Sequence, residues 1–291
     1  MKLTGIIAYP ITPFSFSGEC IDFPVLGRCL EQLINAGSDA IAPLGSTGES
    51  AYLSQKEWEA VAAYTVELVA NRVPVVVGIS EITTSQAVNK AKYAESIGAD
   101  AVMVIPVSYW KLTDQEIFDY YQEISNVISI PIMVYNNPAT GGVDISPELL
   151  VKMFYEIDNV KMVKESTGDI QRMHKLFELS NGELPFFNGS NTLALEALCA
   201  GASGWCTAAP NLLDQQPKNL YESVARGDLS AAQTIFYQQL PMLRFIVSGN
   251  LPRAIKAGLK LRGIDAGGPR KPLRGSQPEE DALLQSLMKV G

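Results

Sequence analysis

The sequence predicts an α/β fold, a (β/α)8 TIM barrel followed by a C-terminal helical extension. Short apolar segments alternate with longer amphipathic segments, and the apolar segments recur roughly every 30 residues, the length of one strand with its crossover helix. Several apolar segments are continuous, which is typical of strands buried on both faces of a parallel sheet. Such units fit a closed barrel better than a doubly wound sheet. We expect the barrel in residues 1–225 and the extension in residues 226–291.

Eight apolar segments are the predicted strands. They are Gly5–Tyr9, Ala40–Pro43, Val75–Gly78, Ala101–Ile105, Ile132–Tyr135, Val160–Lys164, Pro185–Asn188 and Gly204–Thr207. In a barrel of this kind the strands are parallel, and active sites lie at their C-terminal ends. The residues that directly follow each segment are therefore the first place to look for chemistry.

Capping signals delimit several of the helices between the strands. Ser54-Gln55-Lys56-Glu57 and Thr113-Asp114-Gln115-Glu116 are capping boxes, and Pro147 suits a first helical position. Gly37 and Gly98 are suited to end two helices. The predicted barrel helices are Pro24–Asn35, Ser54 to about Val69, Ser85–Ile97, one after Thr113, one after Ser146, Ile170–Glu178, Leu193–Cys199 and Pro217–Arg226. The extension is predicted to contain Leu229–Val247, Leu251–Arg262, a loop over Gly263–Pro278, and Glu279–Val290.

Composition excludes several classes of protein. With 291 residues, 47% of them apolar, the chain is not expected to be disordered. The 23 Lys and Arg residues against 31 Asp and Glu residues give a net charge of −8, which argues against a nucleic-acid partner. No apolar run reaches the roughly 18 residues of a membrane helix. Pro10 and Pro13 interrupt the N-terminal apolar run, so we interpret it as a first strand rather than a signal peptide. We expect a cytoplasmic protein without a membrane partner.

A metal site or a histidine-based triad is not expected. His174 is the only histidine and falls among charged neighbours in a predicted helix, where a solvated position is the simplest interpretation. The cysteines are Cys20, Cys29, Cys199 and Cys206, and none of them forms a CxxC pair. We therefore expect no metal and no other cofactor.

Lys164 is the most informative single residue. Alternation along the sixth predicted strand puts Val160, Met162 and Lys164 on one side, and Lys161 and Val163 on the other. Burial at the C-terminal end of a strand disfavours the ammonium form of a lysine. A neutral amine is what Schiff-base formation with a keto group requires.

Other interpretations of Lys164 stay open at this point. A lysine at the end of a strand can extend to solvent, and Lys164 could also pair with Glu165. Lys161 is the competing amine, but it lies nearer the start of the strand, where barrel residues serve stability.

Hydroxyl groups follow two other predicted strands. Gly45-Ser46-Thr47-Gly48 combines two hydroxyls with a backbone turn that can bind a carboxylate, although it could equally be an ordinary turn. It is not a P-loop, because no GK[ST] follows. Tyr135 and Tyr109 carry phenols that could relay protons, or they could be aromatic residues at the barrel rim.

These motifs together carry a resemblance to a known family. The chain resembles the dihydrodipicolinate synthase / N-acetylneuraminate lyase family, whose members are class I pyruvate-dependent Schiff-base aldolases. Each motif alone is weak, but their order and their positions after the predicted strands are specific, and the resemblance spans nearly the whole chain. The matching segments are Pro10-Ile11-Thr12-Pro13-Phe14, Gly45-Ser46-Thr47-Gly48-Glu49-Ser50, Tyr135-Asn136-Asn137-Pro138 and Lys164-Glu165-Ser166-Thr167-Gly168-Asp169.

The resemblance implies roles for the residues that match. Lys164 would form an imine with pyruvate or another 2-oxo acid, and Tyr135 would carry protons to and from the reacting atoms. Ser46 and Thr47 would hold the carboxylate of the keto acid, and Thr47 would also connect the tyrosines. The family further implies a TIM barrel without a metal, assembled as a homotetramer, a dimer of dimers.

Three further positions match the family pattern. Gly189 and Cys206 correspond to positions that line the pyruvate pocket, and Tyr109 resembles the second relay tyrosine. The segment over residues 106–112 is one residue longer than the pattern of the synthases, which bears on the assignment of Tyr109.

One position departs from the synthase pattern. The synthases carry an arginine two residues after the proline of the fifth-strand motif, and this arginine binds the carboxylate of aspartate semialdehyde. Here Pro138 is followed two residues later by Thr140, which cannot replace a permanently charged bidentate fork. Thr140 is therefore a candidate substrate-binding residue for a different partner. Arg244 or Arg253 could instead supply the missing cation.

Three functions follow from these observations. The leading hypothesis is a Schiff-base lyase or aldolase that joins pyruvate to, or releases it from, an aldehyde or sugar-acid-like substrate other than aspartate semialdehyde. The second is a 4-hydroxy-tetrahydrodipicolinate (dihydrodipicolinate) synthase of lysine biosynthesis. The third, from a different class, is a non-catalytic barrel that binds a keto acid without turnover.

Overall fold

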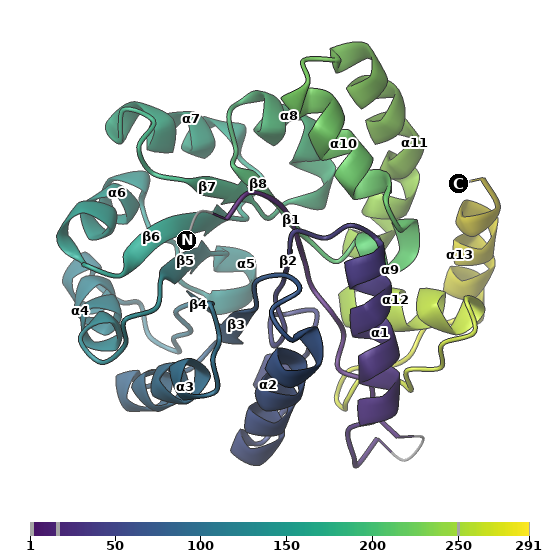
Figure 1. Cartoon of the computed structure of the whole chain (residues 1–291), viewed down its shortest axis with the longest axis horizontal. Helices are drawn as coiled ribbons and strands as arrows, with labels where there is room; N and C mark the ends of the chain where they lie inside the picture. The colour runs from purple at the N-terminus through teal and green to yellow at the C-terminus, as the bar shows by residue number, and fades with distance from the viewer. Residues whose placement is uncertain (1–2, 16–17, 249–250, 291) are drawn as a thin grey trace.

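Eight parallel strands form the centre of the molecule, as the sequence predicts (Figure 1). The computed structural model describes residues 3–15, 18–248 and 251–290. The strands are β1 (Gly5–Ala8), β2 (Ala40–Ile41), β3 (Val76–Ile79), β4 (Ala101–Val104), β5 (Ile132–Asn136), β6 (Val160–Glu165), β7 (Phe186–Asn188) and β8 (Gly204–Thr207). β1 pairs with both β2 and β8, and a parallel bridge between Ile41 and Val75 closes the ring between β2 and β3.

Helices surround the strands, and the predicted capping signals are confirmed. Ser54 and Thr113 both form complete capping boxes, Ser146 caps the helix that Pro147 opens, and Gly37 and Gly98 have positive φ angles after their helices. The barrel helices of the predicted set are α1 (Phe23–Asn35), α2 (Gln55–Val69), α3 (Thr84–Ser96), α4 (Asp114–Ser125), α6 (Pro147–Glu156), α7 (Ile170–Leu179), α8 (Ala194–Cys199) and α10 (Gln216–Ala225).

Short elements were not predicted from the sequence. They are α5 (Pro138–Gly141), α9 (Pro210–Leu213) and the two 3₁₀ turns η1 (Ser50–Tyr52) and η2 (Asn191–Leu193). A helix of one turn is too short to show a 3.6-residue periodicity, so hydrophobic patterns do not reveal it. β2 is shorter than predicted, because it ends at Ile41 before Pro43, which lacks the N–H group that a strand pair uses.

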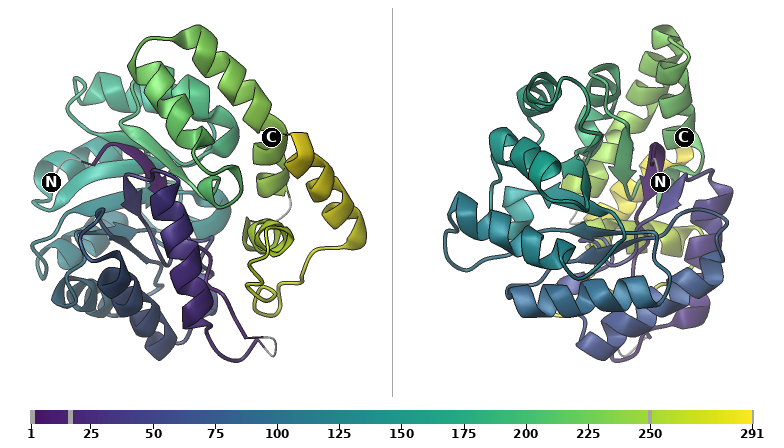
Figure 2. Two further views of the ribbon diagram at one scale, coloured as in Figure 1. Left: turned by 45° about the vertical axis from the view of Figure 1, so that its right-hand side comes forward. Right: turned by 60° about the vertical axis from the view of Figure 1, so that its left-hand side comes forward.

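The C-terminal helices lie together on one side of the barrel (Figures 1 and 2). They are α11 (Leu229–Ser248), α12 (Leu251–Leu261) and α13 (Pro278–Val290), and the predicted loop separates the last two. Gln239 of α11 donates a hydrogen bond to the Gln216 carbonyl of α10 (3.0 Å), so the extension packs on the barrel. We propose residues 1–225 and 226–291 as the two parts of the chain; Gly291 and residues 249–250 lie outside the described residues.

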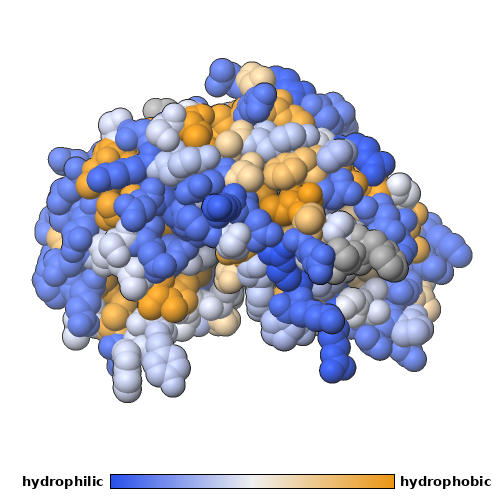
Figure 3. All heavy atoms as spheres, turned by 90° about the horizontal axis from the view of Figure 1, so that it is seen from below, coloured by the Kyte–Doolittle hydropathy of each residue, from blue (hydrophilic) through white to orange (hydrophobic). Residues whose placement is uncertain are grey.

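The surface mixes polar and apolar residues. On the face seen in Figure 3, hydrophobic residues form separate patches bounded by hydrophilic residues. In the described part of the chain, no helix combines the length and the apolar character that crossing a membrane requires.

Candidate active site

Lys164 is buried at the C-terminal end of β6, between two tyrosine rings. Lys164 is only 6% exposed, so it does not extend to solvent. Its Nζ atom lies 3.7 Å from the ring centroid of Tyr135 and 4.2 Å from that of Tyr9. Lys161, the competing amine, is exposed. Val160 lies opposite Ile132 and Met162 lies opposite Met133, so no residue of β5 lies opposite Lys161.

Glu165 does not pair with Lys164 but binds groups on the other side of β6. Its carboxylate accepts hydrogen bonds from Asn136 Nδ2 (3.1 Å) and from the Thr167 backbone N–H (2.8 Å). It also forms an ion pair with Arg172 Nε at 3.2 Å, and its side chain is fully buried. These contacts hold the ends of β5 and β6 together and leave the Lys164 amine without a carboxylate partner among the contacts described.

The phenol of Tyr135 faces the Lys164 amine and is tuned by its neighbours. Asn137 Nδ2 donates a hydrogen bond to Tyr135 Oη (2.9 Å). Burial by itself raises the pKa of this phenol, but the charge of Lys164 and hydrogen bonds with Asn137, Ser46 and Lys164 outweigh it, so the pKa of Tyr135 lies below its usual value. A phenol that loses its proton more readily is suited to accept and return a proton at a reacting carbon.

A cavity of about 180 Å³ lies around the Lys164 amine. Nearly all of the residues that the sequence predicts for the site line it: Lys164, Tyr135, Ser46, Thr47, Thr140, Gly189 and Cys206. They come from five different strand ends that are far apart in the sequence. A second cavity, of about 450 Å³, shares Ser46, Tyr135 and Thr140 with the first.

Gly189 and Cys206 shape the wall near Lys164. A Cβ atom on Gly189 would lie 1.7 Å from Ser166 Oγ and 2.9 Å from Lys164 Cε, so only glycine leaves room for the lysine. Burial raises the pKa of the Cys206 thiol, against the opposing effects of Lys164 and of a hydrogen bond with Tyr9. Cys206 therefore contributes a neutral thiol to the cavity.

The turn that carries Ser46 and Thr47 is tied to the start of the chain. The Gly48 N–H donates to the Gly45 carbonyl (3.0 Å), and Thr12 Oγ1 donates to the Gly48 carbonyl (2.6 Å). Thr47 is buried, whereas Ser46 is open to both cavities.

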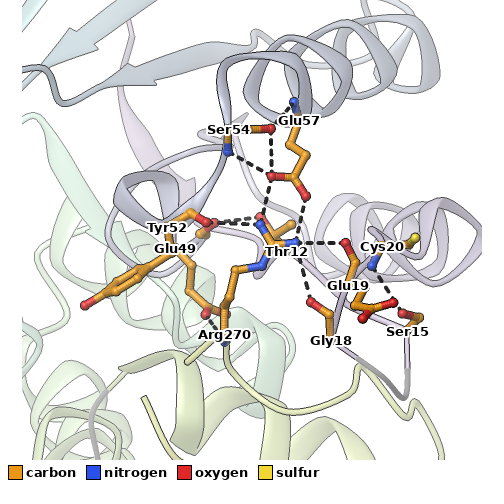
Figure 4. A network of polar contacts seen from close by, with 11 residues as sticks. Thr12, Ser15, Gly18, Glu19, Cys20, Glu49, Tyr52, Ser54, Glu57 and Arg270 are labelled. Atoms are coloured by element: carbon orange, nitrogen blue, oxygen red, sulfur yellow. Dashed lines mark hydrogen bonds and ion pairs between the residues drawn. The ribbon is translucent and has the colours of Figure 1, made fainter. Parts of the chain in front are cut away.

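Glu49, directly after this turn, anchors it to the C-terminal extension. It has a left-handed backbone conformation (φ 56°) and a fully buried side chain. Its carboxylate accepts hydrogen bonds from Lys256 Nζ (2.6 Å) and from the Arg270 backbone N–H (2.7 Å). Figure 4 shows Arg270 beside Glu49 and between Glu57 and Gly18, so a single residue of the extension binds three segments of the barrel.

Tyr109 is not brought to the cavities in this single chain. It is 88% exposed on the loop after β4, beside Trp110, and it lines neither cavity. Neither Arg244 nor Arg253 is among the described residues that line these two cavities, and Arg253 NH2 pairs with Glu280 at 2.9 Å. His174 is exposed on α7, as predicted.

Other residues of the site were not singled out from the sequence. Tyr9, Asn137, Ser166, Asn191 and Thr207 also line the smaller cavity. Each follows or ends a predicted strand or lies within three residues of its end, so the position itself was the available signal. The contacts of Tyr9 with Lys164 and of Asn137 with Tyr135 depend on side-chain directions that the sequence does not specify.

Comparisons with known proteins agree with this geometry. A sequence model described as the dihydrodipicolinate synthetase family matches residues 2–290. The 4-hydroxy-tetrahydrodipicolinate synthase of Methanopyrus kandleri is 30% identical over 291 residues, which covers 100% of this chain and 97% of that protein.

Solved structures agree as well. A proposed dihydrodipicolinate synthetase from Pseudomonas aeruginosa has a TM-score of 0.98 and 52% identity, with 99% of each chain covered. The chloride-inhibited dihydrodipicolinate synthase of Acinetobacter baumannii, solved with pyruvate, has a TM-score of 0.93 and 26% identity, covering 99% of this chain and 98% of that one.

Proposed function

Because the chain belongs to the dihydrodipicolinate synthetase family and is a lyase of that family, we propose that it joins pyruvate to an aldehyde, or releases pyruvate from the product, through an imine on Lys164. The observation that carries this proposal is the buried Lys164 amine beside the Tyr135 phenol. The solved relative that holds pyruvate supports pyruvate as the keto acid.

The proposed reaction begins with formation of the imine. The Lys164 nitrogen attacks the keto carbon of pyruvate, and Tyr135 gives its phenolic proton to the keto oxygen. This oxygen leaves as water, which gives a protonated imine and the phenolate of Tyr135. The hydroxyls of Ser46 and Thr47 hold the carboxylate in place. The positive charge of the imine accepts electrons from the methyl group, so a methyl proton moves to the phenolate of Tyr135 and an enamine forms.

Carbon–carbon bond formation follows in the same cavity. The enamine carbon attacks the carbonyl carbon of the aldehyde, the imine re-forms, and Tyr135 protonates the new alkoxide. Water then hydrolyses the imine, which frees the Lys164 amine and releases a 4-hydroxy-2-oxo acid. Cleavage runs through the same steps in reverse. Proton transfer by a positioned group contributes about 10²–10⁴-fold to such rates.

A second candidate is 4-hydroxy-tetrahydrodipicolinate synthesis, the activity for which the Methanopyrus kandleri relative is named. Thr140 argues against it, because this position in the cavity wall offers no cation to the carboxylate of aspartate semialdehyde. A coupled assay with pyruvate and aspartate semialdehyde separates the two candidates. We also propose a cytoplasmic homotetramer, a dimer of dimers, on the strength of the family resemblance.

Borohydride trapping tests the proposed imine. The protein is reduced in the presence of pyruvate, and the adduct is located by intact mass and peptide mapping. We expect one pyruvate adduct on Lys164, its loss in Lys164→Ala, and its retention in Lys161→Ala, which removes the exposed amine of the same strand. Circular dichroism verifies that each variant is folded. Trapping that survives in Lys164→Ala, or fails in the folded natural chain, would refute the proposal.

A further inference from the structure

The larger cavity lies where the second substrate has to extend. It has a volume of about 450 Å³, which is within the usual size of a ligand pocket, and it shares Ser46, Tyr135, Thr140, Val247 and Leu251 with the cavity around Lys164. An aldehyde carbon that meets the enamine must lie next to Lys164 and Tyr135. The rest of the aldehyde then has this adjoining space to occupy.

Apolar side chains form the inner wall of the larger cavity. They are Leu44 after β2, Ile79 at the end of β3, Met103 within β4 and Ile105 directly after β4, and all four are buried. They form part of the same hydrophobic core as the rest of the barrel. Water against such a wall makes few hydrogen bonds, so an apolar substituent that displaces it gains free energy.

The charges around the larger cavity do not suit an anion. Glu49 is the only charged side chain among the described residues that line it. Both carboxylate oxygens of Glu49 are engaged, one with Lys256 Nζ and the other with the Arg270 backbone N–H. A carboxylate entering this space would lose its hydration without meeting a free cation, and it would lie near another carboxylate.

A small polar feature completes the wall. The hydroxyls of Ser80 and Ser50 lie 3.4 Å apart and interact with each other, and Thr140 adds a hydroxyl where the two cavities meet. These groups are uncharged. They can tolerate a polar atom on a substrate, but they do not provide the fixed charge that selects an acid.

We propose that the second substrate is an uncharged aldehyde with an apolar aliphatic or aromatic substituent, which occupies the cavity lined by Leu44, Ile79, Met103 and Ile105. This inference rests on the proposed function and specifies the aldehyde that it leaves open. In the cleavage direction, the same cavity holds the substituent of the 4-hydroxy-2-oxo acid that is split.

Isosteric aldehydes test the proposal with the natural chain. One pair is 4-isopropylbenzaldehyde and 4-carboxybenzaldehyde, and the other is 4-methylpentanal and 4-oxobutanoate. Within each pair the shape is nearly constant, and only the charge changes. We expect kcat/KM, measured as consumption of pyruvate, to be at least about tenfold higher for the uncharged member, a difference that corresponds to about 1.4 kcal/mol.

Substitution at the cavity wall provides a second, independent measurement. Leu273 lines the larger cavity from the loop before α13 and is only partly buried, so a change there is less disruptive than one in the barrel core. Leu273→Lys should lower the ratio of kcat/KM for the uncharged aldehyde to kcat/KM for its carboxylated partner at least severalfold, because the lysine gives the carboxylate a cation. Leu273→Met, the matched uncharged variant, should leave this ratio unchanged.

The outcomes separate this inference from the proposed function. A missing borohydride adduct on Lys164 would remove the proposed function, and this inference with it. With the adduct present, the inference alone fails if carboxylated aldehydes react as fast as their uncharged partners or faster. It also fails if no uncharged aldehyde is consumed, or if the lysine and methionine variants have the same preference.

Discussion

At the scale of single residues, the contacts of Lys164 determine what its amine can do. Two aromatic faces, those of Tyr9 and Tyr135, surround the amine, while the neighbouring carboxylate of Glu165 is bound to Arg172. Aromatic faces attract an ammonium group without holding it in a fixed ion pair. The nitrogen thus remains available to attack a keto carbon, which an ion pair with Glu165 would hinder.

Substitution of Gly189 tests whether Lys164 can react from a displaced position. Gly189→Ala puts a Cβ atom against Ser166 Oγ and Lys164 Cε, so the lysine has to move. Displacement of a reacting group by about 1 Å can cost about 10²-fold in rate, and we expect a loss of that order in the rate of borohydride trapping with pyruvate.

The matched control for Gly189 is Gly275→Ala, because a Cβ atom at Gly275 meets nothing within 4 Å. This variant should trap pyruvate at the natural rate. Equal trapping rates in the two folded variants would show that the lysine tolerates displacement.

The sequence predicted part of this site. Lys164, Tyr135, Ser46 and Thr47 were identifiable because strand ends and family motifs mark them, and the structure places them around one cavity. The Tyr9 ring against Lys164 was not identifiable, because a tyrosine after a strand has many possible partners. Which residues touch depends on packing across strands that are distant in the sequence.

At the scale of elements, a buried ion pair between Glu49 and Lys256 links the barrel to its extension. The two side chains are 0% and 2% exposed, and the pair connects the turn after β2 to α12. Lys256 also lies over the Phe14 ring at 4.2 Å and donates to the Gly268 carbonyl. The sequence predicted the strand before the turn and the helix of Lys256. It did not predict the ion pair, because 207 positions separate the two residues.

Removing one partner of this pair should be costly. Lys256→Met leaves the Glu49 carboxylate buried without its cation, and we expect a loss of about 3–5 kcal/mol in the free energy of unfolding. Lys256→Met combined with Glu49→Gln should recover part of that loss. Urea denaturation measures both changes.

The control for the buried pair is Lys175→Met. This change breaks an ion pair with Glu178 in which both side chains are well exposed, so it should change stability by at most about 1 kcal/mol. If Lys175→Met and Lys256→Met lower the free energy of unfolding equally, then burial of the Glu49–Lys256 pair does not determine the cost of breaking it.

At the scale of the whole molecule, a second ion pair makes stability depend on pH. Arg270, in the loop before α13, forms two hydrogen bonds with Glu57 of α2, at 2.7 and 2.8 Å. Hydrogen bonds from Arg270 lower the pKa of Glu57 from 4.5 to about 2, against the opposing effect of burial and with help from Ser54. Because the folded pKa lies below the unfolded one, this stabilisation is complete above about pH 4.5 and disappears as the pH falls toward 2.

Arg270→Leu should remove the acid-sensitive part of this stability. We expect the difference in Tm between the natural chain and Arg270→Leu to be largest at pH 6 and to shrink toward pH 3. A constant part remains, because Arg270 also donates to the Tyr52 carbonyl.

The matched control is Arg226→Leu, which breaks an exposed pair with Glu222 and should change Tm little at either pH. A Tm difference for Arg270→Leu that is the same at both pH values would contradict the assignment to Glu57.

The ring of strands is not uniform around its circumference. β5 and β6 are paired over five positions, whereas β2 and β3 meet only at the bridge between Ile41 and Val75, beside the hydrogen bond from the Gly78 N–H to the Pro43 carbonyl. Local opening of a barrel is easiest where the fewest hydrogen bonds must break, so we expect it at the boundary between β2 and β3. Ser46 and Thr47 lie in the turn after β2, so the turn that we propose to bind the carboxylate lies beside the most weakly paired boundary of the ring. The hydrogen bonds of Glu49 with Lys256 and Arg270 restrain this turn where strand pairing does not.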